Sequence, residues 1–288
     1  TNFVDSILIQ TDSDGSAPTT GTLNTATGNI GIGKDVLESL TEGKYNVVFG
    51  YDAGDSITSG EGHVFIGRNA GGAATVGSTG SVMVGDNAGA EFATSSGWPL
   101  TAVGSQAGQY MAGANNTFMG HQAGMSESGT TNNVQNAGFG YAALAKLNDG
   151  GSYNIAMGGY AGYKVTTGDS NAFLGNSAGY NTTTGRFNIA IGDGAMHGTT
   201  GNASERTVAI GYRAGYVLDG GHDNILLGFE TGTAITSGGS NIALGKRAAK
   251  SITTGSRNIA IGQSALDLAD TESDNIAIGY DALGGSVA

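Results

Sequence analysis

The pentapeptide Asn188-Ile189-Ala190-Ile191-Gly192 decides the fold, and it recurs unchanged at 258–262 and 275–279. Its glycine, here termed the anchor glycine, returns every 16 to 20 residues. The fifteen anchor glycines are Gly33, Gly50, Gly67, Gly85, Gly104, Gly120, Gly140, Gly158, Gly175, Gly192, Gly211, Gly228, Gly245, Gly262 and Gly279. A repeat of this length is typical of a solenoid, in which each repeat forms one coil that stacks on the next. The sequence therefore predicts an all-β fold, a parallel β-solenoid of about 15 coils with a ~17-residue repeat.

The three residues before each anchor glycine are predicted to form a strand that is apolar on both faces. Ile189 and Ile191 share one face because side chains alternate along a strand, and Ala190 points to the other. The middle position is uncharged in every coil, and in several coils it is large: Phe65, Phe118, Phe173 and Leu226. A strand that is apolar on both faces must be buried on both faces.

The two strand faces are expected to be covered in different ways. Alanines recur three residues after the anchor glycine, and we expect them to cover the face of the flanking pair, which includes Ile191, inside the coil. A coil of this length is too thin to bury the other face. We therefore expect a homotrimer around a threefold axis, in which the partner chains face Phe65, Phe118, Phe173 and Leu226. The alternative is a single-chain solenoid with one apolar face in water.

An asparagine stands four residues before most anchor glycines, as at Asn171 and Asn188. Stacked at the ~4.8 Å spacing of strands, such amides can hydrogen-bond along a column, so we predict a structural ladder rather than a binding site. Residues 1–28 precede the first repeat and are predicted to be an N-terminal cap or junction. Residues 29–288 are predicted to form the repeat domain, a β-roll.

The composition excludes several classes of protein. The chain has 53 glycines but only 2 prolines, and 39% of its residues are hydrophobic, so neither collagen nor a disordered linker fits. Its formal net charge of −12 disfavours nucleic acid and anionic membranes as partners. There is no cysteine, and no apolar run is long enough to cross a bilayer, so we expect no membrane insertion.

Short matches to catalytic motifs are better explained by the repeat. Residues 175–179 fit the Gly-x-Ser-x-Gly pattern of a nucleophile elbow, but they are an ordinary anchor segment with serine at a variable position. The four histidines (His63, His121, His197 and His222) fall in different coils and at different positions, without the spacing of a metal site. The sequence predicts no enzyme, and no catalytic, cofactor-binding or metal site.

The pentapeptide resembles the repeat of YadA-type heads of trimeric autotransporter adhesins, although that repeat is shorter. The longer pattern at 158–171 and 175–188 is similar to repeats in phage tail-fibre proteins and bacterial surface fibres. The resemblance covers about residues 29–283. It implies a left-handed, trimeric β-roll that serves as a structural segment of a phage tail fibre or virion appendage, joined to other fibre or virion proteins and attaching to a host. The alternative is a bacterial cell-surface adhesin or extracellular filament of the same architecture.

Receptor contacts are expected where the repeat offers distinctive groups. Trp98 lies in a long irregular stretch, and Tyr163 and Tyr180 occupy the same position in adjacent coils, where they can stack and contact sugar faces of a host glycan. The alternative is that these rings merely cover turns. A further alternative is ice binding, which a row of threonines would allow; the row includes Thr166, Thr183, Thr236 and Thr253. A role in turns explains the row better, because a glycine follows most of these threonines.

Overall fold

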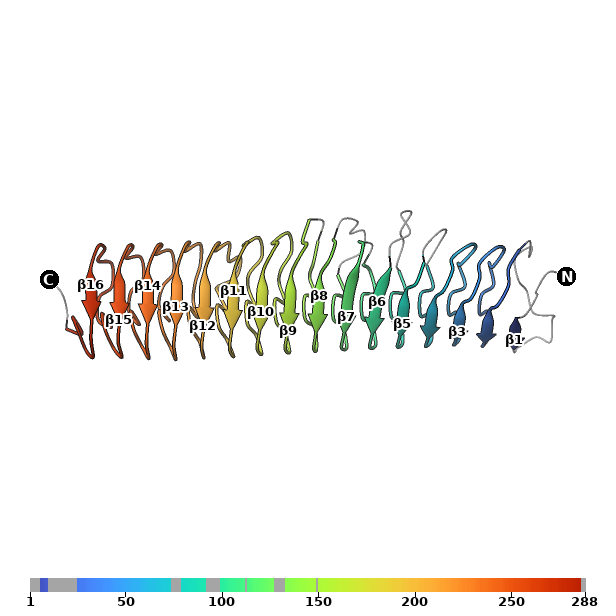
Figure 1. Ribbon diagram of the computed structural model, residues 1–288, viewed down its shortest axis with the longest axis horizontal. Coiled ribbons are helices and arrows are strands. Elements are labelled where there is room, and N and C mark those ends of the chain that lie inside the picture. The colour runs from blue at the N-terminus through green and yellow to red at the C-terminus, as the bar shows by residue number, and fades with distance from the viewer. Residues whose placement is uncertain are drawn as a thin grey trace. The chain divides into compact units, whose positions relative to one another are not determined.

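The computed structural model describes residues 6–9, 25–73, 79–91, 99–111, 113–126, 133–148 and 150–285. Within them it contains sixteen short strands and no helix, which confirms the predicted parallel β-solenoid with a repeat of about 17 residues (Figure 1). The strands are β1 (Ile7–Ile9), β2 (Ile30–Ile32), β3 (Val47–Phe49), β4 (Val64–Ile66), β5 (Val82–Val84), β6 (Leu100–Val103), β7 (Asn116–Met119), β8 (Ala137–Phe139), β9 (Ile155–Met157), β10 (Ala172–Leu174), β11 (Ile189–Ile191), β12 (Val208–Ile210), β13 (Ile225–Leu227), β14 (Ile242–Leu244), β15 (Ile259–Ile261) and β16 (Ile276–Ile278).

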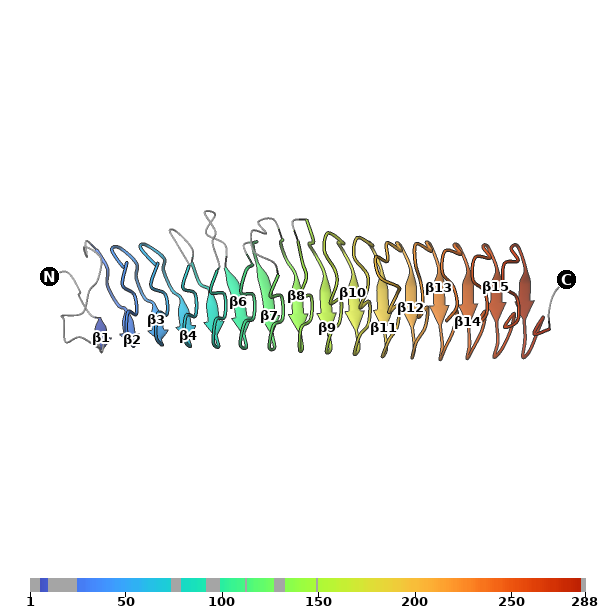
Figure 2. The same ribbon diagram turned by 180° about the vertical axis from the view of Figure 1, so that it is seen from behind.

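The chain divides into two compact units, Thr1–Ala142 with Leu147–Asp149, and Ala143–Lys146 with Gly150–Ala288. Strands β1–β8 belong to the first unit and β9–β16 to the second. Within each unit every strand pairs in parallel with the next one along the chain, and the arrows of neighbouring coils point the same way (Figure 2). The coils are aligned at equivalent positions relative to their anchor glycines: Ile189 pairs with Val208, and Ile191 pairs with Ile210, without a shift in register.

Most anchor glycines are required by the close approach of the next coil. Gly192 has φ +127°, and a Cβ at this residue would lie 2.6 Å from the carbonyl oxygen of Gly211. The same arrangement recurs at Gly245, where a Cβ would lie 2.7 Å from the carbonyl oxygen of Gly262. A side chain would therefore clash with the neighbouring backbone and strain its own conformation.

The expectation about which strand face is internal was wrong. The middle residues fill the core of the chain itself, because no side-chain surface is exposed at Phe65, Phe118, Phe173 or Leu226. The flanking residues point outward instead: Ile189 is 40% exposed and Ile225 41%, and Ile191 is half-buried. The middle side chains therefore do not face partner chains, and the apolar face that lacks a cover is the one that carries Ile191.

In several coils the core is filled by a pair of residues whose sizes compensate each other. A large middle residue faces a glycine four residues after the anchor glycine, as Phe173 faces Gly179, where the ring leaves no space for a Cβ. In other coils a small middle residue occurs with a large residue at that second position, as Ala260 occurs with the buried Leu266, although Ala209 occurs with Gly215. Both Gly179 and Leu266 have positive φ, +63° and +55°. In the coils with such a pair, the core is filled either from the strand or from the turn.

This compensation predicts the outcome of a double substitution. Phe173→Ala should lower the free energy of unfolding by about 3–5 kcal/mol because it leaves a cavity. Gly179→Leu alone should also destabilise, because its side chain overlaps the ring. The double variant copies the Ala260–Leu266 arrangement, so urea unfolding should show it at least about 2 kcal/mol more stable than the sum of the single effects. Phe173→Ala combined with Gly232→Leu, in another coil, serves as the control and should show no such rescue.

The predicted asparagine ladder is confirmed. In the second unit, the backbone N–H and the Nδ2 of Asn171 both donate to Oδ1 of Asn154, at 3.1 and 3.0 Å. Oδ1 of Asn171 in turn accepts from the backbone N–H and the Nδ2 of Asn188, each at 3.0 Å. Nδ2 of Asn171 also donates to the carbonyl of Gly185 at 2.9 Å. Each buried amide is therefore satisfied by the coil on either side and by a turn of its neighbour.

Loss of one member of the ladder should be costly. Asn171→Ala removes the Nδ2 donor to Oδ1 of Asn154 and to the carbonyl of Gly185, and it leaves the N–H of Asn188 without its acceptor, so we expect about 2–4 kcal/mol of destabilisation. Asn176→Ala is the control, because Asn176 is exposed and its Nδ2 reaches only the carboxylate of Asp193, at 3.2 Å. It should change stability by no more than about 0.5 kcal/mol. Equal urea midpoints for the two variants would contradict a stabilising role for the ladder.

Candidate functional site

A column of aromatic rings runs along the turns of four successive coils in the second unit. It consists of Tyr163, Tyr180, His197 and Tyr216, each five residues after its anchor glycine, and is here termed the aromatic column. The ring centroids of Tyr163 and Tyr180 are 5.2 Å apart, those of Tyr180 and His197 are 5.0 Å apart, and those of His197 and Tyr216 are 5.0 Å apart. All three contacts are stacked, and all four side chains are half-buried.

The stacking decides which part of each ring a ligand can reach. Tyr163 and Tyr180 do lie together, as the sequence predicts, but their faces are turned towards neighbouring rings along the column. The first and last rings have further contacts: Tyr160 contacts Tyr163 edge-on at 5.5 Å, and the Arg213 guanidinium lies 5.0 Å from the Tyr216 centroid. The column therefore presents ring edges and phenol groups to solvent, which favours polar contacts over the stacking of a sugar on a ring face. Trp98 lies outside the described residues.

Two cationic side chains border the aromatic column. Nζ of Lys164 lies 5.6 Å from the centroid of Tyr180. The Arg213 guanidinium lies between two rings, 5.2 Å from the Tyr212 centroid and 5.0 Å from that of Tyr216. All three distances are in the range of cation–π contacts, which hold the charges beside the column without neutralising them.

Sequence reasoning identified only part of this group of residues. Tyr163 and Tyr180 were found because they are the same residue type in adjacent coils, whereas His197, Tyr216, Lys164 and Arg213 were missed. His197 and Tyr216 could have been identified from their distance to the anchor glycine, which is the same as that of Tyr163 and Tyr180. Residues at the same distance from their anchor glycines lie in one column. The cations required the structure, because Lys164 and Arg213 stand at different distances from their anchor glycines.

The threonine row serves the contacts between coils. Oγ1 of Thr166 donates to the carbonyl of Thr183 at 3.1 Å, and Oγ1 of Thr236 donates to the carbonyl of Thr253 at 3.1 Å. Oγ1 of Thr183 reaches the carbonyl of Asn202 in the same way, at 3.2 Å. Because these hydroxyls are engaged by the backbone of the next coil, their geometry favours the turn role over the ice-binding alternative.

The remaining sequence motifs stay apart in the fold. Ser177 lies in a turn after β10 with φ +55°, and no helix follows it, so the arrangement differs from a nucleophile elbow. His63 is buried in the asparagine column of the first unit, where its Nδ1 accepts from the backbone N–H of Ser81 at 3.2 Å. In the described part of the chain, no three His, Cys, Asp or Glu side chains form a group that could hold a metal ion.

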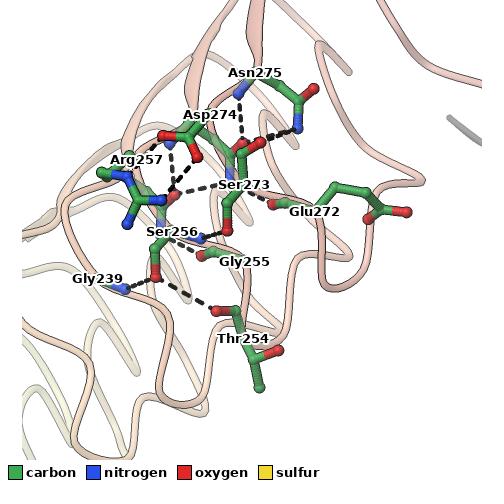
Figure 3. Close-up of polar contacts among 11 residues, drawn as sticks. Gly239, Thr254, Gly255, Ser256, Arg257, Glu272, Ser273, Asp274 and Asn275 are labelled. Atoms are coloured by element: carbon green, nitrogen blue, oxygen red, sulfur yellow. Dashed lines mark hydrogen bonds and ion pairs between the residues drawn. The ribbon is translucent and has the colours of Figure 1, made fainter.

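Polar ladders also join the last coils on the side of the strand start (Figure 3). Oγ of Ser256 accepts from the backbone N–H of Gly239 at 3.1 Å, and Oγ of Ser273 accepts from the N–H of Ser256 at 3.0 Å. Next to them, Arg257 binds Asp274 with both Nε and Nη2, at 2.6 and 2.7 Å. A similar pair joins Arg206 to Asp223 at the equivalent position, and Arg247 binds Glu230 on the turns that follow the strands, so arginines bridge successive coils on more than one side.

These ion pairs alter titration without adding much stability. The hydrogen bonds from Arg257 lower the pKa of Asp274 below its ordinary value, and the same contact raises the pKa of Arg257. Because the carboxyl pKa is lowered in the folded state, any contribution to stability is present at neutral pH and is lost as the pH falls through the folded pKa. Both groups are exposed to solvent, so this contribution is small and the pairs mainly fix the relative position of the coils.

Comparisons with known proteins do not assign a family. No family model matches the chain, and no curated protein or solved structure matches it significantly. Among the residues that the structure describes, no helix is long and apolar enough to cross a membrane. The structure therefore establishes the chain as a parallel β-solenoid repeat protein.

Proposed function

We propose that this protein is a structural segment of a phage tail fibre or related virion appendage, assembled as a homotrimer and located outside the cell. The observation that carries the proposal is the outward strand face. Its two positions, flanking the middle residue, hold no charged residue in any coil, although the chain carries a formal net charge of −12. This surface is termed the outward β face, and Ile189, Ile191 and Ile225 belong to it.

A continuous apolar face of this kind needs a cover in water. Single soluble proteins rarely expose apolar patches of more than a few hundred Å². Covering the exposed part of a side chain such as Ile189 or Ile225, each about 40% exposed, contributes on the order of 1 kcal/mol. With two such positions per coil and eight strands in each unit, the gain is of the size needed to offset an association cost of about 4–15 kcal/mol.

The partner that fits the outward β face best is another copy of the same chain. A copy has the same spacing between coils, so each coil can pack against the equivalent coil of its partner when the chains run parallel. A threefold arrangement lets each chain bury its face against two others, and trimers are also what the resemblance to YadA-type heads and tail-fibre repeats implies. The coils themselves have a filled core and are joined by ladders of hydrogen bonds, which suits a mechanical role.

The association can be tested by placing charge on the outward β face. Ile189→Asp combined with Ile225→Asp should convert the trimer to a monomer that retains its β-sheet circular dichroism, because the substituted positions lie outside the core. Gln263→Asp adds a charge at an exposed turn position and should leave the trimer intact. Light scattering after size exclusion measures the mass. A wild-type monomer in native buffer, or a trimer of the doubly charged variant, would refute the proposed assembly.

Whether the protein is part of a phage particle can be tested separately. Antibodies against the protein are expected to label appendages of purified phage particles by immunogold electron microscopy. The competing function is a bacterial surface adhesin or filament, favoured by the resemblance of 188–192 to the adhesin repeat. Labelling of the surface of cells that carry no phage, together with unlabelled particles, would establish that alternative instead.

A further inference from the structure

We propose that the aromatic column, together with Lys164 and Arg213, binds an acidic glycan, meaning a sugar polymer that carries carboxylate groups. This inference rests on the proposed function, because an exposed binding surface on a fibre segment would serve attachment. The column lies on the turns after the strands and not on the outward β face, so trimer formation through that face and glycan binding use different side chains.

The first support is the orientation of the rings. The faces of Tyr180 and His197 are occupied by their stacked neighbours, with interplanar angles of 3° and 21° in the two contacts of His197. Solvent therefore meets ring edges, where the quadrupole of an aromatic ring is positive, and phenol hydroxyls that donate hydrogen bonds. A surface of this kind favours anionic or strongly hydrogen-bonding groups.

The second support is that the two flanking cations lack the acidic partner that five arginines of this protein have. Arg68, Arg186, Arg206, Arg247 and Arg257 each form an ion pair with a carboxylate of an adjacent coil. Among the described residues, no carboxylate forms an ion pair with Lys164 or Arg213. Their charges remain available in a chain that is strongly acidic overall, which makes this surface locally complementary to an anion.

The third support is the repetition, which distinguishes a polymer from a single small anion. Equivalent rings recur at 5.0 to 5.2 Å along four coils, with Lys164 near one end of the column and Arg213 near the other. A linear ligand can bind several of these coils at once and gain affinity from linked weak contacts. The site offers few positive charges among many hydroxyl and ring-edge contacts, which suits a sugar chain, with its many hydroxyl groups, better than a nucleic acid, whose backbone presents mainly phosphates.

The test compares polygalacturonate, an acidic glycan, with dextran, a neutral one, as ligands of the intact assembly in calorimetry. The wild-type protein should bind polygalacturonate, more weakly as salt is raised, and should not bind dextran measurably. Lys164→Gln combined with Arg213→Gln removes both cations and keeps the rings, and it should weaken binding at least about tenfold.

A matched control removes two cations elsewhere. Lys34→Gln combined with Lys44→Gln is suitable because Lys34 also lies over a tyrosine, 5.5 Å from the Tyr51 centroid, but has Asp35 at 3.5 Å, while Lys44 has Glu61 at 3.8 Å. This control should bind as the wild type does. An equal loss of affinity in both double variants would show diffuse attraction and overturn the proposal, as would preferential binding of dextran or binding of neither glycan.

The mass of each sample, measured alongside, separates the two proposals. A trimer that binds neither glycan overturns the binding site and leaves the proposed fibre assembly standing. A monomer that binds polygalacturonate through Lys164 and Arg213 supports the binding site but overturns the assembly on which its role in attachment depends.

Discussion

The structure depends on how closely the backbone of one coil approaches that of the next at the anchor glycines. At Gly192 and Gly245 the neighbouring carbonyl oxygen occupies the space that a Cβ would need. This approach sets the spacing at which strands pair, and the spacing in turn allows Asn154, Asn171 and Asn188 to form a continuous amide ladder. Side-chain columns such as the aromatic column are a consequence, because any residue type repeated at one position is brought to stacking distance.

Much of the fold follows from the period alone. The anchor glycines and asparagines predict parallel coils and a buried amide ladder, and the structure contains both. The sequence does not reveal directly which strand face is internal, because alternation gives two sets of side chains and both are apolar here. The distinguishing information lies in the turn: Gly179 accompanies Phe173, whereas Leu266 accompanies Ala260. Such compensation identifies the middle residue as internal, but it is visible only when positions six residues apart are compared coil by coil.

The candidate site was predictable to a lesser degree for a related physical reason. Tyr163 and Tyr180 could be placed together from their positions in the repeat, but the direction of their faces depends on ring rotations that the period does not define. In the structure, these rotations turn the ring edges, and not the ring faces, towards solvent. The absence of an acidic partner for Lys164 and Arg213 among the described residues is likewise a property of the folded surface, because the chain holds 24 acidic residues against 12 basic ones.

The link between each coil and the next has a consequence for how such a protein can change in length. Hydrogen bonds of the amide ladder join equivalent positions and are indifferent to the number of turn residues between them: Asn171 and Asn188 are 17 residues apart, whereas Asn188 reaches Thr207 over 19 residues. The energetic cost of enlarging a surface loop grows only slowly with its length. Whole coils are therefore natural modules for duplication or deletion, since recombination between equivalent asparagines would rejoin the ladder without altering the contacts inside any remaining coil.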